Sequence, residues 1–437
     1  MAVVVVVGAG FGDEGKGSVT DFLTRKHKAG TVVRFNGGPQ AGHNVLTSNG
    51  KHHVFSQFGS GTFAGARTHL NRFMLVNPVT MLTEGAHLLE LGINDAFERV
   101  TVDEEALVIT PYHVALNRIE ELCRNSRHGS CGMGIGVTVA DSLARPEQAI
   151  RFKDLDPGSV KALDEKLQGI QERLFRVALF TTSGIPQSPL LKKEMDCLTL
   201  PSAVIMERFR ALKKTGVRSV GEEYLGSILQ SGNVIFEGAQ GALLDEKYGF
   251  HPHTTRSDCT FGNARTLLKG YDVDVTNLAV LRAYHTRHGA GPFPTEYEDG
   301  PNDPRNPPNS WQKNFRVGFF DRVLAQYAQE ILQDIDAVAL CHMDQVRWPN
   351  SICYSYRCPD NNILRKIPLV TRDEYELQLT DHAAKGAAYR HPLFDVVPKY
   401  KDIDRLEEFL YIISDTMKAP VTILSRGPTA EDKVCLT

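Results

Sequence analysis

One segment, VVVVVGAGFGDEGKGS at residues 3–18, carries the pattern that predicts the fold. Its five consecutive valines are typical of a strand that is buried on both faces of a parallel sheet. Five glycines fall within residues 8–17, and Val19, Phe22 and Leu23 then lie on one face of an expected helix. The order strand, glycine-rich loop and helix indicates a phosphate site, because glycine backbone N–H groups and a helix N-terminus attract anions.

This loop departs from two phosphate-loop patterns. Residues 10–16 match GxxxxGK, but Gly17 stands where that pattern has a magnesium-binding Ser or Thr. Asp13 stands at the third glycine of the dinucleotide-binding pattern. A carboxylate repels phosphate, so Asp13 and Glu14 make sense if one of them binds magnesium or accepts a proton. The alternative is a tight strand-to-helix turn with solvated acids.

Short apolar runs recur along the chain and alternate with helical patterns. This alternation predicts an α/β fold with a large, mostly parallel central sheet flanked by helices. We expect a single domain over residues 1–437, with a long surface loop at Pro301–Asn309. Helical patterns are clearest at 163–174 and 406–413. The expected strands after the first are 31–35, 234–236, 278–281, 337–340 and 421–424.

Composition narrows the classes of function. The chain has 49 basic and 52 acidic side chains, a net charge of −3, so a general attraction to nucleic acid or anionic lipid is excluded and a polyanion must bind a local site. No apolar run approaches the roughly 18 residues that a membrane span needs. The eight cysteines form no CxxC pair, which predicts a reduced, cytoplasmic chain without a disulfide framework or zinc ribbon.

Polar clusters follow several of the expected strands. His43, within QAGHN at 40–44, is a candidate acid or electrophile. Glycines at 129–136 and the EGAQG motif at 237–241 indicate backbone that lies close to a ligand.

Three further clusters lie nearer the C-terminus. His251 and His253 have no third candidate ligand nearby, so a loop with solvated histidines is favoured over a metal site. Asp344 follows an expected strand, where a carboxylate is able to accept two hydrogen bonds from guanine, and SRGP at 425–428 follows the last strand.

Taken together, these motifs resemble the adenylosuccinate synthetase family over the whole chain. The most specific is GDEGKG at 12–17. The others follow in order: QAGH at 40–43, the glycine loop at 129–136, EGAQG at 237–241, GAGPFPTE at 289–296, HMD at 342–344 and SRGP at 425–428.

The resemblance implies a reaction. Members of the family condense IMP with L-aspartate to give adenylosuccinate, cleave GTP to GDP and phosphate, and use Mg²⁺. By matching positions, Asp13 is the base that removes the N1 proton of the purine, and the 6-oxyanion then attacks the γ-phosphate. His43 assists the phosphoryl transfer as an acid, and Lys16 contacts the transferring phosphate. The Asp13 carboxylate and the Gly42 carbonyl contact the metal.

The resemblance also implies binding sites. Arg145 falls where an arginine reaches across a two-fold axis, so a homodimer is implied, with no nucleic-acid or membrane partner. Lys313 and Arg316 are the candidates for binding aspartate. The GTP residues are Gly12, Glu14, Gly15, Lys16, Gly17, Gly42, His43, Asn44, Asp344, Ser425, Gly427 and Pro428. The purine-nucleotide residues are Asp13, Gln40, Ser130, Cys131, Arg145, Gln240 and Thr255.

Several positions depart from the family pattern, and they concern substrate recognition. Gln40 replaces an asparagine and His342 a lysine, and segment 309–318 lacks the paired threonines and most arginines that hold aspartate. One alternative is therefore a specialised paralogue that uses GMP or dGMP to make 2-aminoadenylosuccinate, as some phage enzymes act on dGMP, or that uses another amine donor. A P-loop triphosphatase or kinase and a purine-nucleotide sensor are the competing classes.

Overall fold

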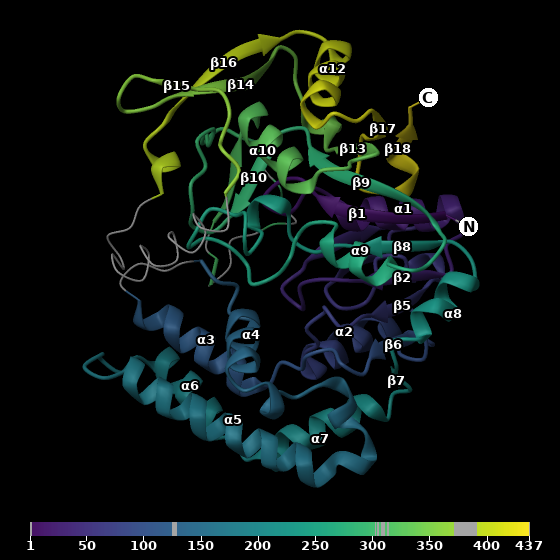
Figure 1. The fold of residues 1–437 in the computed structure, drawn as a ribbon, viewed down its shortest axis with the longest axis vertical. Coiled ribbons are helices and arrows are strands. Elements are labelled where there is room, and N and C mark those ends of the chain that lie inside the picture. The colour runs from purple at the N-terminus through teal and green to yellow at the C-terminus, as the bar shows by residue number, and fades with distance from the viewer. Residues whose placement is uncertain are drawn as a thin grey trace.

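The computed structural model of the chain describes residues 2–124, 129–301, 303, 306, 311, 312, 314–370 and 391–436. Within these residues, ten strands form one sheet in the order β18-β17-β13-β9-β1-β8-β2-β5-β6-β7, and every neighbouring pair is parallel except β17 and β18. The α/β fold with a mostly parallel central sheet is therefore confirmed, and Figure 1 shows the sheet in the middle of the molecule. Its strands are β1 (Ala2–Gly8), β2 (Thr31–Arg34), β5 (Arg67–Leu70), β6 (Val100–Asp103), β7 (Arg218–Val220), β8 (Val234–Glu237), β9 (Asp274–Arg282), β13 (Ala337–Cys341), β17 (Val421–Ser425) and β18 (Lys433–Cys435).

The valine run of β1 is buried on both faces, as predicted. Val3, Val5 and Val7 belong to one apolar cluster, while Val4 and Val6 belong to another. This division follows from the two-residue period of a strand, which sends successive side chains to opposite faces. Helix α1 (Lys16–His27) packs Val19 and Leu23 into the second cluster. Strand β1 thus separates two layers of the core.

All six expected strands lie in the sheet, but β5, β6, β7 and β18 were not predicted. Their sequences mix polar and apolar residues, for example RTHL in β5 and VTVD in β6. In β6 all four residues are nevertheless buried, because other parts of the chain cover both faces of this side of the sheet.

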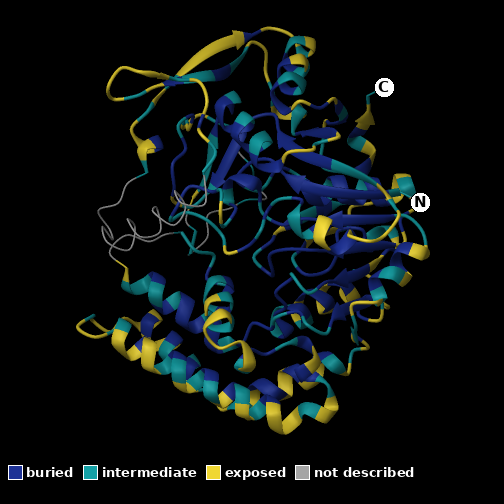
Figure 2. Cartoon of the chain, in the orientation of Figure 1, coloured by how far each residue is buried: buried dark blue, intermediate teal, exposed yellow. Residues whose placement is uncertain are grey.

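Helices α3 to α7 form a layer at one end of the molecule (Figure 1). The apolar residues of this layer form one cluster with those of β5 and β6. The outward side of α5 is exposed in Figure 2. The predicted helical pattern at 163–174 lies within α5. The helices on this side are α2 (Pro78–Glu90), α3 (Pro111–Cys123), α4 (Ile135–Ala144), α5 (Val160–Thr181), α6 (Pro189–Leu198) and α7 (Ser202–Lys213).

A small second sheet lies at the other end, beside helix α12 (Leu406–Met417), which contains the predicted helical pattern at 406–413 (Figure 1). Strand β14 is parallel to β12 and antiparallel to β15 and β16. Helix α10 (Arg322–Leu332) connects this sheet to the central one and packs on β14 and α12. The strands are β12 (Phe320–Asp321), β14 (Asn350–Arg357), β15 (Ile363–Leu364) and β16 (Val397–Ile403).

Two antiparallel strand pairs border the carboxyl ends of the central strands. They are β3 (His43–Leu46) with β4 (His52–Phe55), and β10 (His285–His288) with β11 (Phe315–Gly318). Two short helices, α8 (Tyr224–Gln230) and α9 (Gly262–Leu268), are the remaining α-helices among the described residues. Among the described residues, no helix is long and apolar enough to cross a membrane.

Candidate active site

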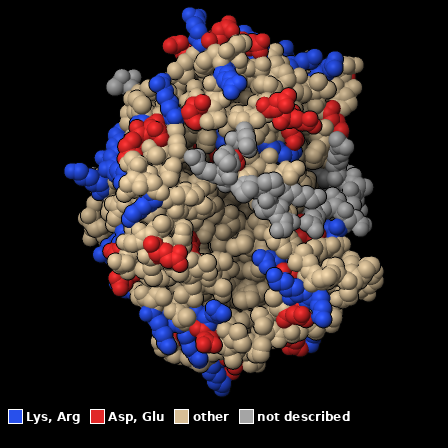
Figure 3. All heavy atoms as spheres, turned by 180° about the vertical axis from the view of Figure 1, so that it is seen from behind, with Lys and Arg blue, Asp and Glu red and all other residues tan. Residues whose placement is uncertain are grey.

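A cavity of about 1110 Å³ opens at the carboxyl ends of the central strands. This is where open α/β sheets bind ligands, because the loops that leave neighbouring strands meet there. Figure 3 shows a face of the molecule that is hollowed near its centre and carries acidic and basic side chains interspersed. The cavity wall is built from the loops after β1, β2, β8, β13 and β17, together with α3, α4 and the two antiparallel strand pairs.

Most of the residues predicted from the sequence line this one cavity. Glu14, Arg145 and Arg316 are described but are not part of the wall, and Lys313 lies outside the described residues. The predicted residues in the wall are Gly12, Asp13, Gly15, Lys16, Gly17, Gln40, Gly42, His43, Asn44, Ser130, Cys131, Gln240, Thr255, Asp344, Ser425, Gly427 and Pro428.

The glycine-rich loop is held closed by Glu14. Its carboxylate accepts hydrogen bonds from the backbone N–H groups of Gly10 (3.0 Å) and Gly12 (2.8 Å) and pairs with Lys16 Nζ at 2.5 Å. Glu14 is 2 % exposed and points back into its own loop. Its charge therefore neutralises Lys16 and shapes the loop. Asp13, which faces the cavity, adopts a left-handed backbone conformation with φ 60°.

Gly17 explains why the P-loop pattern is broken. A Cβ at this position would lie 2.7 Å from His43 Cβ and 3.0 Å from the His43 carbonyl carbon. Helix α1 and strand β3 are therefore too close for the Ser or Thr of a P-loop. The same close packing holds His43 against the phosphate loop.

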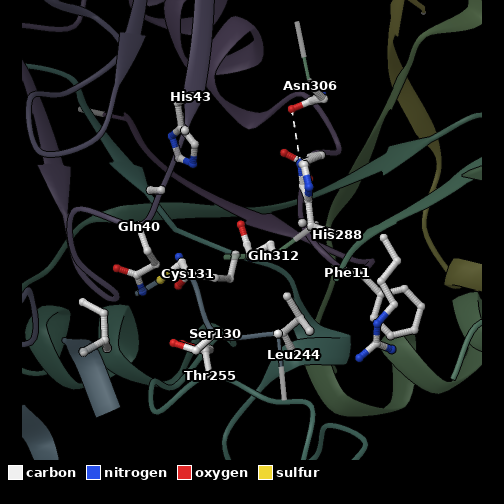
Figure 4. A pocket seen from close by; sticks show the side chains of 18 of the residues that line it. Phe11, Gln40, His43, Ser130, Cys131, Leu244, Thr255, His288, Asn306 and Gln312 are labelled. Atoms are coloured by element: carbon white, nitrogen blue, oxygen red, sulfur yellow. Dashed lines mark hydrogen bonds and ion pairs between the residues drawn. The ribbon is translucent and has the colours of Figure 1, made fainter. Parts of the chain in front are cut away.

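His43 is half of a buried acid–imidazole pair. Its Nδ1 lies 2.6 Å from Oε1 of Glu237, which is fully buried at the end of β8. Ser60 donates to both carboxylate oxygens, from its hydroxyl and its N–H, and Arg34 Nε lies 4.0 Å from Glu237 Oε2. Figure 4 shows the His43 ring pointing into the cavity. Glu237 stands within the EGAQG motif, but sequence analysis gave it no role.

The charges of this pair follow from its surroundings. Burial alone would raise the pKa of Glu237, but the imidazole of His43 and the guanidinium of Arg34 hold it below its ordinary value. Burial lowers the pKa of His43, and the Glu237 carboxylate partly offsets this. We therefore describe the pair as a carboxylate that accepts the Nδ1–H of a neutral imidazole, which leaves Nε2 available to a ligand.

Two glutamine side chains present unsatisfied polar atoms. Both amide atoms of Gln40, and Oε1 of Gln240, are buried without a hydrogen-bond partner among the described residues. Buried polar groups of this kind are rare unless a ligand or water completes them. Both residues line the cavity, and Figure 4 shows Gln40 near Cys131. Burial raises the pKa of the Cys131 thiol to about 11, so this side chain acts as a neutral group rather than a nucleophile.

The 251–256 loop differs from the sequence prediction. His251 is buried, not solvated, and its Nε2 lies 2.8 Å from the Glu246 carbonyl oxygen, so that expectation was wrong for His251. The fully buried Arg287 fixes the loop by donating to the carbonyl oxygens of His253 (3.1 Å) and Pro292 (2.9 Å). The hydrogen bonds from Arg287 to backbone carbonyls thus hold the loop in place, and Thr255 of this loop lies in the cavity wall.

The far end of the cavity contains the candidate base pocket. Asp344 lies on a short 3-10 turn after β13, and Gln345 donates its amide hydrogen to Asp344 Oδ2 at 2.6 Å. Ser425 Oγ donates to the Gly427 carbonyl oxygen at 3.0 Å, which shapes the opposite wall.

The wall next to Asp13 contains residues that sequence analysis missed. His288, Asp303 and Asn306 line the cavity there, with Arg282 beside them. Asp303 and Asn306 belong to the Pro301–Asn309 segment, which was expected to be a surface loop. Pro301 is the other residue of this segment that the structure describes.

Arg316, a predicted aspartate ligand, pairs with Glu296 (2.8 Å) and donates to the Gly291 carbonyl oxygen.

Comparisons with known proteins agree with this architecture. The sequence model of one family, described as adenylosuccinate synthetase, matches residues 5–434. The chain is 30 % identical to the adenylosuccinate synthetase of Syntrophobacter fumaroxidans (strain DSM 10017 / MPOB), over 100 % of this chain and 99 % of that protein. It is 29 % identical to that of Marinomonas sp. (strain MWYL1), over 99 % and 98 % of the two chains.

Two solved structures have a similar fold. The fully ligated adenylosuccinate synthetase of Plasmodium falciparum superimposes with a TM-score of 0.74 at 20 % identity, over 100 % of both chains. The succinoaminodeoxyadenylate synthetase of cyanophage S-2L, bound to dGMP and dATP as an energy donor, gives 0.60 at 16 % identity, over 99 % of this chain and 95 % of that one.

Proposed function

The chain belongs to the adenylosuccinate synthetase family of C–N ligases, and from this premise we propose that it joins a 6-oxopurine nucleotide, IMP, to L-aspartate while GTP is cleaved to GDP and phosphate. One observation carries the proposal. A carboxylate, Asp13, faces the cavity from within a phosphate-type loop, and the same cavity is lined by His43, which pairs with buried Glu237. A triphosphatase that activates only water has no need of a carboxylate inside its phosphate loop.

The proposed reaction has two steps. In the first, the N1–H bond of the purine breaks, its proton passes to the Asp13 carboxylate, and O6 attacks the γ-phosphorus as the bond to GDP breaks. In the second, the amine nitrogen of aspartate bonds to C6, the C6–O6 bond breaks with loss of phosphate, and the amine proton passes to solvent. The glutamines Gln40 and Gln240 supply the unsatisfied amide atoms that a purine nucleotide would complete.

His43 serves the first step. Its Nδ1–H is donated to Glu237, so Nε2 faces the ligand. The negative charge of a bound triphosphate favours a second proton on the ring. His43 then donates a hydrogen bond to the transferring phosphoryl group, with Glu237 stabilising the imidazolium.

The residues present fit Mg²⁺. The Asp13 carboxylate and the Gly42 carbonyl are hard oxygen donors in the cavity wall, which suits an ion that takes most of its remaining ligands from phosphates and water. When bound, the ion neutralises charge on the phosphates.

Asp344 is the proposed reader of guanine in the triphosphate. Its carboxylate accepts from N1–H and N2–H of the base, beside Ser425, Gly427 and Pro428. Gln345 already donates to Oδ2 of this carboxylate, which leaves further acceptor sites on both oxygens. We expect Asp344→Asn to relax the preference for GTP over ATP. Unchanged discrimination would remove Asp344 from this role.

A homodimer is part of the proposal. Arg145 directly follows α4, is exposed and does not line the cavity of its own chain. The exposed apolar side chains Leu143 (70 %) and Phe180 (86 %) lie on the neighbouring helices α4 and α5, which an ion pair between Asp141 and Arg173 joins. We expect Leu143→Asp to weaken self-association in sedimentation experiments, whereas an unchanged sedimentation coefficient would place the interface elsewhere.

The test is mass analysis of products from aspartate, Mg²⁺ and GTP with IMP, GMP or dGMP in parallel, and a fourth reaction without purine nucleotide. A succinylated IMP product supports the proposal. A product from GMP or dGMP alone supports the specialised paralogue, the kind of nucleotide present in the cyanophage structure. Phosphate release without any purine nucleotide identifies a triphosphatase, and no release at all identifies a sensor. Phosphate release that needs the purine but yields no adduct points to another amine donor.

Asp13→Ala tests the base. We expect loss of turnover with nucleotide binding retained, and Asp272→Ala on the exposed surface serves as the control. Activity within about tenfold of wild type, about 1.4 kcal/mol of barrier, would exclude Asp13 as the base.

A further inference from the structure

A ring of polar contacts surrounds Asp13. Its backbone carbonyl accepts from Arg282 Nη1 (3.1 Å), and Arg282 Nη2 donates to Asp303 Oδ2 (2.8 Å). The same Asp303 oxygen accepts from Asn306 Nδ2 at 3.0 Å. Asn306 Oδ1 lies 3.4 Å from His288 Nε2, and that nitrogen lies 3.5 Å from Asp13 Oδ2, which closes the ring. Figure 4 shows His288 and Asn306 together on one wall of the cavity.

The direction of these contacts is set by chemistry. Both neighbours of His288 Nε2 are oxygens that accept, the carboxylate of Asp13 and the amide oxygen of Asn306. Asn306 presents its oxygen to His288 because its amide nitrogen is used on Asp303. The arrangement requires a hydrogen on His288 Nε2, which lies at an ion-pair distance of 3.5 Å from Asp13 Oδ2.

His288 has a special place in this ring. Within the part of the chain that the structure describes, no other side chain is within ion-pair or hydrogen-bond distance of the Asp13 carboxylate. The His288 ring is itself fixed, because it packs on the ring of Phe315 with centroids 4.8 Å apart. It is also 83 % buried, the side chain being 17 % exposed.

We propose that His288 is a positioning residue that directs the Asp13 carboxylate toward the purine. The inference rests on the proposed role of Asp13 as the base. An N–H donor on one side of the carboxylate restricts its rotation, so that the other oxygen is presented to N1–H of the nucleotide. The proposal requires the contacts of 3.4 and 3.5 Å to shorten when substrate binds, as catalytic hydrogen bonds commonly do. Arg282 fixes the backbone of Asp13, and His288 fixes its side chain.

The proposed positioning role requires a hydrogen-bond donor at the position of His288 Nε2, and it does not require the ring to transfer a proton. Two amide side chains, neither of which transfers a proton, test where the donor has to lie. The amide nitrogen of glutamine reaches the position of Nε2, whereas that of asparagine reaches only the position of Nδ1. His288→Gln retains the donor, while His288→Asn and His288→Val lose it.

The first test is steady-state kinetics of purine-dependent phosphate release. We expect His288→Val and His288→Asn to lower kcat by about 10- to 100-fold, the effect of a misplaced catalytic group, with the KM for GTP within about threefold. His288→Gln is expected to stay within about fivefold of wild type. Equal loss in all three variants, or no loss in any, would overturn the proposal. His27→Gln, at the end of α1, is the control for a general effect of removing a histidine.

The second test does not depend on turnover. Crystal structures of the variants with the purine nucleotide alone are expected to show the Asp13 carboxylate in one position in wild type and His288→Gln. In His288→Val and His288→Asn it is expected to leave that position. An unmoved carboxylate in all variants would overturn the proposal even if no turnover is detected. If the wild-type protein shows no purine-dependent phosphate release, that result counts against the proposed function. The crystal structures then still decide the role of His288.

Discussion

Two fully buried carboxylates lie at strand ends in this molecule, and they have opposite properties. Glu237, at the end of β8, is surrounded by Arg34, His43 and Ser60, and these neighbours hold its pKa below the ordinary value against the effect of burial. Asp321, at the end of β12, has no cation nearby among the described residues. Burial raises its pKa to about 7, although its hydrogen bonds with Tyr356 and with the N–H groups of Leu324 and Val323 lower it in part.

The comparison shows how this fold uses buried charge. Asp321 caps α10 and joins the small sheet to that helix, a task that needs acceptor oxygens, which the neutral acid retains. Glu237 faces a site where a phosphoryl group is expected to transfer, and there a permanent charge is useful. Burial is the same in both regions, and the neighbouring side chains decide the ionisation.

The largest effect is expected from Glu237→Gln. The change removes the charge that orients His43 and leaves Arg34 buried without its counter-ion. We expect kcat to fall about 100-fold, in the range seen when the orienting partner of an active-site group is lost. Unfolding should become easier by about 3–5 kcal/mol, the cost of breaking a buried pair. Product assays and denaturant titration measure the two effects, and wild-type values in both would contradict the description of an ionised pair.

Asp321→Asn is expected to change the pH dependence of stability. The wild-type group has a pKa of about 7 when folded and about 3.8 when unfolded, so between these values the folded chain holds a proton that the unfolded chain has lost. Its contribution to stability is thus present below pH 4 and lost as the pH rises through 7, by at most about 1.4 kcal/mol per pH unit. Asparagine keeps the helix cap and removes this titration.

Thermal unfolding of both proteins at pH 5 and pH 8 measures the difference. The stability of the variant relative to wild type should rise between the two pH values. A constant difference would mean that Asp321 does not titrate in this range.

Ser60→Ala removes one hydroxyl donor from the ionised carboxylate. A hydrogen bond to a charged group is worth about 1.5–3 kcal/mol, so we expect the free energy of unfolding to fall by about that amount. We also expect kcat to be lower than in wild type. The Ser60 N–H remains as a second donor to Glu237, which limits the effect on His43. Denaturant titration together with kcat for the same preparation measures both quantities.

Tyr356→Phe removes one hydroxyl donor from Asp321 and is the matched change in the other region. The Tyr356 hydroxyl lies 2.6 Å from Asp321 Oδ2. At pH 5, below the Asp321 pKa of about 7, we expect a loss of about 1 kcal/mol in unfolding free energy, the value for a bond between uncharged partners, with kcat unchanged. A larger loss than for Ser60→Ala would reverse the ranking of the two sites and contradict the proposed difference in charge.

The parts of the molecule that could be predicted from sequence are those whose pattern is local. The valines of β1, the glycine loop and helix α1 are consecutive, and each carries its own signal. Strands β5 and β6 could not be predicted, because polar residues interrupt them and their apolar residues pack in a cluster that includes helices later in the chain. The periodicity of hydrophobic residues indicates a buried strand or helix only where that element is itself amphipathic or wholly apolar.

The candidate site divides in the same way. Asp13, Lys16 and His43 stand in recognisable motifs, and the structure brings them to one cavity. Glu237 pairs with a histidine 194 residues away, and no local pattern indicates that contact. His288 is similar, because its relation to Asp13 arises where β10 passes the phosphate loop. Glu14 shows the reverse case, a charged residue in a phosphate motif whose contacts are made within its own loop.

The position of β1 in the sheet has a consequence for synthesis of the chain. Val3 pairs with Val234 on one side, and Ala2 to Gly8 pair with residues 274–280 on the other. The central strand is made before its partners, which leave the ribosome about 230 and about 270 residues later, roughly 12 to 54 seconds at common elongation rates. During that time five adjacent valines have no native partner and are a target for chaperones. We therefore expect the sheet to assemble late, by insertion of a waiting strand between β8 and β9.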